Sequence, residues 1–284
     1  MVRIQSFFHE QSNTFSYLLW GEDKHAVVID SALDFDMFTG EIDTTSADEI
    51  VEMATREQLT VNWLLETHIH ADHISAASYL KKKLQTKIGL SEELISVRSR
   101  FQPKFANASD RVAQASIDEF FKDGDLLRFG ENEIQVLSTP GHTPDSVSFY
   151  VCGNIFVGDT LFMPDSGTAR CDFPQGSASV LFDSIQKLYH LSDDTVVWMC
   201  HDYGAGGRDF ANRTSIGECK QSNIHITANT SRDEFVSKRE SRDKTLSAPK
   251  LLLPSIQMNI AAGATEYKND YLAIPMTFKG GFHA

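Results

Sequence analysis

Residues 67–73 read THIHADH and place three imidazoles and one carboxylate within residues 68–73. The preceding residues 61–66, VNWLLE, are typical of a buried strand, and residues 74–84 are typical of a helix. The motif is therefore predicted to lie on a strand-to-helix loop, where a rigid scaffold can aim its side chains at one point. Histidine and aspartate are common metal ligands. We accordingly interpret His68, His70, Asp72 and His73 as a metal-binding group rather than as a solvated polar loop.

Three later segments contain residues of the same kind. Residues 139–144, TPGHTP, follow a strand-like run, and their proline and glycine residues predict a sharp loop that presents His142. Residues 154–160, NIFVGDT, predict a short strand that ends near Asp159, and residues 196–203, VVWMCHDY, predict another that ends near His201. Each segment alone is weak evidence, because a strand-end aspartate is more often a turn former or a helix cap. The ordered set is much stronger evidence for a metal site.

With these motifs in this order, the chain resembles the metallo-β-lactamase superfamily over most of its first two hundred residues. The resemblance implies an α/β fold, the αββα sandwich, in which two mixed sheets pack face to face with helices outside. The metal site would lie at one edge, at the strand ends. Carried over by motif, one metal pocket would hold His68, His70 and His142. A second would hold Asp72, His73 and His201, with Asp159 able to bridge the two.

The length and the pattern of elements agree with one large domain. A chain of 284 residues can bury a sizeable core. We predict paired strands at residues 14–20 and 26–29, a helix at residues 47–58 with Ser46 as its N-cap, and a helix at residues 177–191. Residues 1–212 are predicted to form the catalytic core, and residues 213–284 a short C-terminal extension of helices and loops packed on the same domain.

Composition narrows the class of protein. The net charge of −13 argues against a nucleic-acid partner, because phosphate binding needs clustered Lys and Arg. No run of eighteen apolar residues predicts a membrane helix, and residues 1–8 read as a strand rather than a signal peptide. The four cysteines form no C-x-x-C pair, so disulfides are not expected. We therefore expect a cytoplasmic protein without a membrane partner, and we also expect a homodimer.

A loop and a tail indicate one branch of the superfamily. Residues 166–173, SGTARCDF, together with the triplet HDY at residues 201–203, are similar to the persulfide dioxygenases, a branch related to glyoxalase II. Residues 251–260, LLLPSIQMNI, are similar to the tail of the longer bacterial members. Glyoxalase II has a different loop here, Gly-Arg-x-Phe-Glu, and a larger helical C-terminal domain.

This resemblance implies one Fe²⁺ per chain, held by His68, His142 and Asp159. Two imidazoles and one carboxylate form the facial triad of non-haem iron oxygenases. The substrates would be glutathione persulfide and O₂, and the products sulfite and glutathione. The remaining motif residues would orient ligands and water by hydrogen bonds. They equally complete a dinuclear site, so a dinuclear zinc hydrolase of glutathione thioesters or of lactones stays open as the alternative; these residues are His70, Asp72, His73 and His201.

The resemblance also suggests roles around the metal. Arg170 is predicted to bind a carboxylate of glutathione, with a structural salt bridge to Asp172 as the alternative. Tyr203 is predicted to contact substrate and, with His70, to act in catalysis. Cys171 is interpreted as a small space-filling residue, with a thiol that is modified by persulfide or oxidised during turnover as the alternative. A sulfurtransferase that supplies persulfide would be a separate protein. The other histidines lie outside any metal-like spacing and are interpreted as surface or structural residues; they are His9, His25, His190, His225 and His283.

Overall fold

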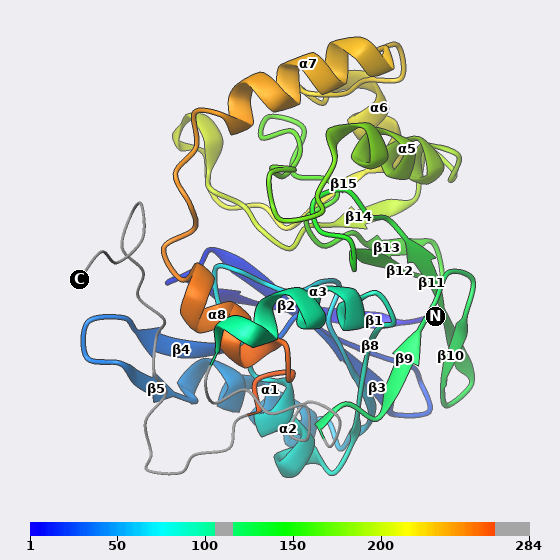
Figure 1. Ribbon diagram of the computed structural model, residues 1–284. Coiled ribbons are helices and arrows are strands. Elements are labelled where there is room, and N and C mark those ends of the chain that lie inside the picture. Colours follow the sequence, from blue (N-terminus) through cyan, green and yellow to red (C-terminus); the bar gives the residue numbers. More distant parts are fainter. Residues whose placement is uncertain (106–115, 265–284) are drawn as a thin grey trace, which may run out of the picture.

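The computed structural model describes residues 1–105 and 116–264, and there it has the four-layered αββα architecture predicted above (Figure 1). Two mixed six-stranded sheets form the inner layers. The first sheet runs in the order β1 (Arg3–His9), β2 (Thr14–Trp20), β3 (His25–Ile29), β6 (Thr60–Leu65), β8 (Lys87–Ser91) and β9 (Glu119–Phe121). The second runs β10 (Leu126–Phe129), β11 (Asn132–Ser138), β12 (Val147–Val151), β13 (Asn154–Phe156), β14 (Val196–Trp198) and β15 (Arg213–Ser215).

Helices and a small sheet complete the outer layers. The first sheet is covered by α1 (Thr45–Arg56), α2 (Ala77–Leu84), α3 (Leu94–Phe101) and α8 (Leu252–Asn259), and the second by α5 (Ala178–Tyr189), α6 (Ile216–Ser222) and α7 (Arg232–Asp243). A three-stranded sheet joins β5 (Glu41–Asp43), β4 (Ala32–Asp36) and β7 (Ile74–Ser75). Short 3₁₀ turns lie at Gln102–Lys104 and Ala205–Gly207. Among the described residues, no helix is both long and apolar enough to cross a membrane.

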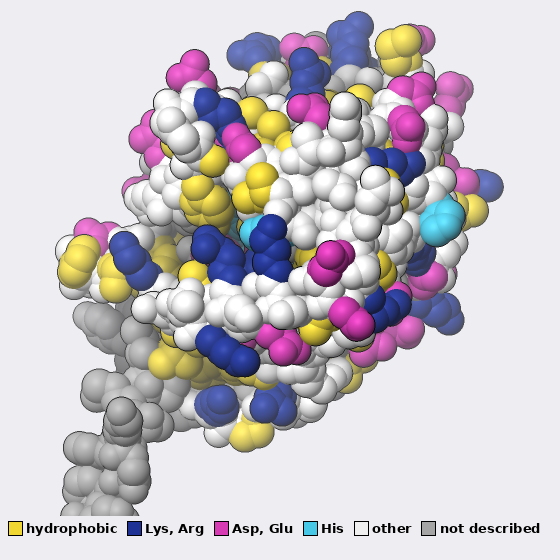
Figure 2. Space-filling view, turned by 90° about the horizontal axis from the view of Figure 1, so that it is seen from above, with side chains coloured by type: hydrophobic (Ala, Val, Ile, Leu, Met, Phe, Trp, Pro, Cys, Tyr) yellow, Lys and Arg dark blue, Asp and Glu magenta, His cyan; other side chains and the backbone are white. Residues whose placement is uncertain are grey.

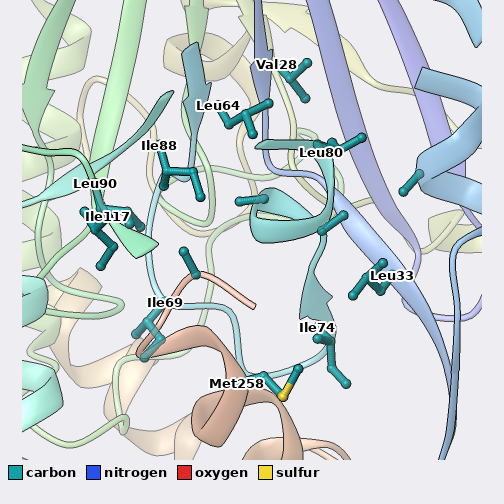
Figure 3. Packing of buried hydrophobic residues seen from close by; sticks show 14 of the residues in the cluster. Val28, Leu33, Leu64, Ile69, Ile74, Leu80, Ile88, Leu90, Ile117 and Met258 are labelled. Carbon is teal, nitrogen blue, oxygen red and sulfur yellow. The ribbon is translucent and has the colours of Figure 1, made fainter. Parts of the chain in front are cut away.

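Three apolar cores fill the spaces between the layers, which explains why β2 is buried along its whole length. Tyr17 and Leu19 face the core between the two sheets, whereas Leu18 and Trp20 face the core beneath α1, α2 and α8. Because alternate residues of a strand point to opposite faces, a strand between two apolar layers is apolar throughout. Figure 3 shows the core under the first sheet, where Met258 of α8 lies with Ile69 of the metal loop and Ile74 directly after it.

Local predictions from the sequence fail at two element ends. The segment predicted as one helix at residues 74–84 begins as strand β7, and α2 begins only at Ala77, because Ile74 pairs with Leu33 of β4. Helix α1 begins at Thr45, so Ser46 lies inside it instead of capping it. The Ser46 hydroxyl donates to the Asp34 carboxylate at 2.7 Å, a tertiary contact that local sequence does not reveal.

The C-terminal segment beyond residue 212 is closely joined to the core. Strand β15 pairs with β14 at the edge of the second sheet, and α8 packs beneath the first. Residues 265–284 of the predicted extension lie outside the described residues. The division of the chain at residue 212 stays a prediction.

Candidate metal centre

The metal loop leaves the carboxyl end of β6 and is held by buried side chains from other elements. Asp30, directly after β3, accepts from the backbone N–H of Thr67 at 2.7 Å and from its hydroxyl at 2.9 Å. Asp145 accepts from the N–H of Ile69 at 2.8 Å. A buried carboxylate that accepts several N–H bonds holds a loop in one conformation. These buried hydrogen bonds therefore tie the loop to two neighbouring segments.

Asn259 of α8, far along the chain, also holds the metal loop in place. Its amide nitrogen donates to the carbonyls of His70 at 2.9 Å and of His73 at 2.8 Å. Its amide oxygen accepts from the N–H of Ser75 at 2.8 Å. The tail LLLPSIQMNI thus contributes directly to the shape of the metal loop, which gives the tail a physical role in the site.

His68, His142 and Asp159 lie together at the edge of the sandwich, and their ligand atoms are all within 4.8 Å of one another. The Nε2 atoms of His68 and His142 lie 3.8 Å and 3.5 Å from the Oδ2 atom of Asp159. They come from three different loops, after β6, β11 and β13. The structure therefore brings together the three residues that the sequence predicts as iron ligands.

In His68 and His142, the hydrogen-bond partner of Nδ1 shows which nitrogen carries the proton and which faces the cluster. The Nδ1 atom of His142 lies 2.6 Å from the carbonyl oxygen of Arg170, which can only accept, so the proton is on Nδ1. The Nδ1 atom of His68 lies 3.0 Å from the Thr67 hydroxyl, whose own proton goes to Asp30. Both histidines then present the lone pair of Nε2 to Asp159. Lone pairs opposite a carboxylate repel unless a cation lies between them, so this trio fits a bound metal ion.

Gly158 allows Asp159 to approach the loop. Its φ of +52° lies in the left-handed region, and a Cβ at this position would lie 2.4 Å from the Thr67 hydroxyl oxygen. Only glycine adopts such a conformation without a steric penalty. The Gly-Asp pair is thus a packing requirement as well as a source of a ligand.

His70 points its two nitrogens in different directions. Its Nε2 atom lies 3.1 Å from Asp30 and 3.2 Å from Glu66, so it donates to a carboxylate. Its Nδ1 atom is buried and has no hydrogen-bond partner among the described residues. Burial opposes the charged form, but the charges of Asp30 and Glu66 raise the pKa of His70 well above its usual value. The His68 and His70 rings lie 4.2 Å apart between centroids, so in neutral His70, with its proton on Nε2, the unpartnered Nδ1 suits a metal ligand beside His68.

Asp72, His73 and His201 form a second group beside Asp159. The Nε2 atom of His201 lies 3.3 Å from Asp72 and 3.5 Å from Asp159. Burial lowers the pKa of His73 to about 4, which keeps this imidazole neutral. The Nε2 atoms of His73 and His201 are buried without a hydrogen-bond partner in the part of the chain described. This group therefore offers ligands for a second metal ion or acceptors for a bound substrate.

One large cleft, about 1200 Å³ in volume, opens onto this centre. Asp72, Asp159 and the three histidines His73, His142 and His201 line its metal end. The tip of the β4–β5 hairpin lines one wall, where Phe38 is 92% exposed. Basic residues from α7 and the segment after it line another part: Arg239, Arg242 and Lys250. The cleft therefore combines a metal end with a cationic part.

Lys and Arg side chains gather beside a histidine on the face seen from above, the side on which α7 lies (Figure 2). Burial, together with the charges of Arg239, Lys238 and Arg242, lowers the pKa of His225 to about 4. Arg239 is tied up in a buried ion pair with Asp243 at 2.7 Å. Arg242 and Lys250 are exposed and, among the described residues, are in no ion pair. They are thus free to attract an anion although the chain as a whole is acidic.

Arg170 lines the cleft, but its guanidinium is already occupied. Its Nε and Nη2 atoms donate to the Asp172 carboxylate at 2.5 Å and 2.6 Å, and its Nη1 atom donates to the carbonyl of Ser247 at 2.6 Å. This fork-to-fork pair is the structural alternative described above. The hydrogen bond to Ser247 links this loop, whose Arg170 carbonyl accepts from His142, to the C-terminal segment. Binding of a substrate carboxylate by Arg170 stays a prediction.

Tyr203 also lines the cleft and is 56% exposed. Its ring stacks on that of His201, with centroids 6.0 Å apart and an angle of 14° between planes. Cys171, by contrast, is buried, and burial raises the pKa of its thiol to about 12. A protonated, buried thiol is a poor nucleophile.

Sequence reasoning missed several residues that organise the site. Asp30, Glu66 and Asn259 act through contacts between segments far apart in the chain, and no local motif marks them. His9 is a buried structural residue, one of the two roles expected for it, and it also lines the cleft. The strand-end position of Asp30, the same signal that identified Asp159, was the available clue.

Comparison with known proteins decides the family. The model of the metallo-beta-lactamase superfamily matches residues 10–201. The chain belongs to this superfamily. It is 39% identical to a probable metallo-hydrolase of Burkholderia pseudomallei over 97% of its own length and 99% of that protein's. It is equally 39% identical to Glyoxylase B2 of Dictyostelium discoideum, over 98% of each chain.

Proteins of the ETHE1 group are more distant. The human mitochondrial persulfide dioxygenase ETHE1 is 32% identical over 71% of this chain and 69% of its own. The crystal structure of ETHE1 from Myxococcus xanthus superposes with a TM-score of 0.75 at 32% identity, covering 92% of this chain and all of that one. The chain therefore has the fold of a superfamily of metal-binding enzymes. Its relatives include proteins named as hydrolases and proteins named as persulfide dioxygenases.

Proposed function

We propose that this superfamily member is a glutathione persulfide dioxygenase with one Fe²⁺ per chain, held by His68, His142 and Asp159. The observation that carries the proposal is this trio, a complete set of two imidazoles and one carboxylate within 4.8 Å. The same set is the preferred coordination of non-haem iron oxygenases. The human relative named persulfide dioxygenase supports the same reading.

The reaction balances without a further reductant. Glutathione persulfide, O₂ and water give glutathione, sulfite and two protons. The sulfane sulfur loses four electrons, and O₂ gains them. Iron, when bound, supplies the redox and spin chemistry that no side chain offers. The residues of the chain hold the metal, position the substrate and exclude bulk water.

The rest of the cleft supports a substrate with anionic ends. Arg242 and Lys250 are cations of the cleft lining without an ion-pair partner in the described part of the chain, whereas the guanidinium of Arg170 is held by Asp172. We propose that Arg242 and Lys250 attract the carboxylates of the glutathione part and that Arg170 binds there only by its remaining hydrogen-bond capacity. Tyr203, exposed beside His201, is proposed to donate a hydrogen bond to the substrate. Two predictions stay open beside these, a homodimer and a separate sulfurtransferase that supplies the persulfide.

A second candidate function rests on Asp72, His73 and His201. With Asp159 between the two groups, the site holds every ligand of a dinuclear zinc hydrolase, which attacks thioesters or lactones with metal-activated water. The relatives named metallo-hydrolase and Glyoxylase B2 favour this reading.

Metal analysis of the protein as purified, combined with an oxygen electrode, separates the two functions. The proposal expects one iron per chain and oxygen uptake that depends on glutathione persulfide, with sulfite formed in equal amount. Two zinc ions per chain, hydrolysis of a glutathione thioester and no oxygen uptake would replace it with the hydrolase.

A further inference from the structure

A chain of hydrogen bonds runs from His9 to the second group of the centre. The Nδ1 atom of His9 lies 2.6 Å from the Ser12 hydroxyl, and this hydroxyl lies 2.6 Å from that of Thr14. The Thr14 hydroxyl in turn lies 3.3 Å from the Nδ1 atoms of both His73 and His201. One buried hydroxyl therefore serves two imidazoles of the site.

The direction of the chain follows from its two ends. At the first end, the Nε2 atom of His9 faces the Asp34 carboxylate at 3.3 Å, an ion-pair distance, and a carboxylate only accepts. The proton of neutral His9 therefore belongs on Nε2, and its Nδ1 atom accepts from Ser12. Ser12 then accepts from Thr14, and the Thr14 oxygen is left with lone pairs only toward the two histidines.

The contacts of His201 and His73, at the second end of the chain of hydrogen bonds, indicate the same direction of donation. The Nδ1 atom of His201 also lies 3.2 Å from the carbonyl oxygen of Asn13, which can only accept, so His201 carries a proton on Nδ1. The Nδ1 atom of His73 faces Thr14 and, at 3.5 Å, Asp72. Both imidazoles thus donate from Nδ1, which leaves the Nε2 atom of neutral His73 with a lone pair toward the cleft.

We infer that His9, Ser12 and Thr14 are positioning residues that set the tautomer of His73, so that its Nε2 atom faces the cleft as an acceptor or a metal ligand. A reversed chain would place a proton on that nitrogen and remove its lone pair. The inference goes beyond the proposed function and holds for the dioxygenase and the hydrolase alike, because both need an acceptor at this place. It concerns the location of one proton within a neutral ring.

Nitrogen-15 NMR of the metal-free protein tests this inference, since protonated and bare imidazole nitrogens have well-separated shifts. His73, assigned with His73→Gln, is expected as the Nδ1–H tautomer in the wild type. In Ser12→Ala the Thr14 hydroxyl loses its acceptor. His201 already carries its Nδ1 proton, so we expect Thr14 to donate to His73 in competition with the more distant Asp72 carboxylate, and His73 should become the Nε2–H tautomer. In Thr14→Val the two tautomers of His73 should mix, and Thr14→Ser should restore the wild-type spectrum.

Ser16→Ala is the matched control, because it removes a buried hydroxyl from the same strand. Within the described residues, this hydroxyl donates to the carbonyl of Asp30 and takes no part in the chain from His9. It should leave the His73 nitrogens unchanged, and thermal melting shows that each variant is folded. If His73 keeps Nδ1–H in both Ser12→Ala and Thr14→Val, the inference is overturned. A change in Thr14→Val alone would overturn the part assigned to Ser12 and His9.

Discussion

At the residue scale, Asp159 connects the two groups of candidate metal ligands. Its two carboxylate oxygens face different groups of the centre, Oδ2 toward His68 and His142 and Oδ1 toward His201. A carboxylate between two such groups can serve one metal ion or bridge two. The choice between the two candidate functions therefore concerns which neighbours of Asp159 share a metal ion with it.

Replacing this carboxylate should remove the metal. In Asp159→Ala, His68 and His142 lose the carboxylate that they share, so we expect metal-free protein and loss of activity, measured by elemental analysis and turnover. Asp193→Ala, on the surface, is the control and should keep its metal. By contrast, His73→Ala is expected to leave the iron in place and to lower turnover roughly ten- to a hundredfold. Full metal loading of Asp159→Ala would contradict the assigned ligands.

Tyr203 tests the substrate side of the same centre. Removing only its hydroxyl in Tyr203→Phe keeps the ring stacked on His201, so the metal content should stay normal while kcat falls. Steady-state kinetics on glutathione persulfide measure the effect. Unchanged kcat would show that the hydroxyl takes no part.

Cys171 is expected to be chemically inert. Because burial raises the pKa of its thiol to about 12, the thiol stays protonated at neutral pH, while Cys152 is exposed. Brief treatment of the folded protein with an alkylating reagent, read by peptide mass spectrometry, should label Cys152 and spare Cys171. Rapid labelling of Cys171 would mean that its loop opens.

At the scale of elements, α8 holds the metal loop in place, although the two are far apart in sequence. Asn259 satisfies two carbonyls and one N–H of the metal loop and its continuation, and all of these groups are buried. Asn259→Ala leaves them without partners, so unfolding should become easier by about 2–4 kcal/mol, and metal affinity should fall. Denaturant melts and metal titration measure both effects. Asn229→Ala, on an exposed turn, is the control; equal stability of the two variants would deny α8 this role.

At the scale of the whole molecule, the cleft joins a metal end to cations contributed by α7 and the segment after it. Combining Arg242→Ala with Lys250→Ala should raise KM for glutathione persulfide and weaken its dependence on salt, because exposed charges act through a screened field. The kcat and the metal content should stay close to wild type. Lys244→Ala, an exposed lysine outside the cleft lining, is the control. An unchanged KM in the double variant would place the glutathione part elsewhere.

The sequence by itself determined the layered fold and the loops that carry the candidate metal ligands. Strand runs, glycine and proline punctuation, and histidines at strand ends are local signals, and the loops with His68, His142 and Asp159 do meet at one edge of the sandwich. These features can be predicted from sequence because they depend on residues close together in the chain, such as the spacing of ligands in THIHADH and the positive φ of Gly158 beside Asp159. The family comparison confirms the fold that these patterns indicate.

Only the tertiary structure decided how those ligands are held and oriented. Asp30, Asn259 and Thr14 reach the centre from segments up to 189 residues away in the chain. The placement of Arg170 against Asp172 and the strand β7 where a helix was predicted depend on such contacts too. A hydrogen bond between distant segments leaves no periodic trace in sequence, because its partners meet only after the sheets have packed. The orientation of the imidazoles is thus a property of the folded molecule.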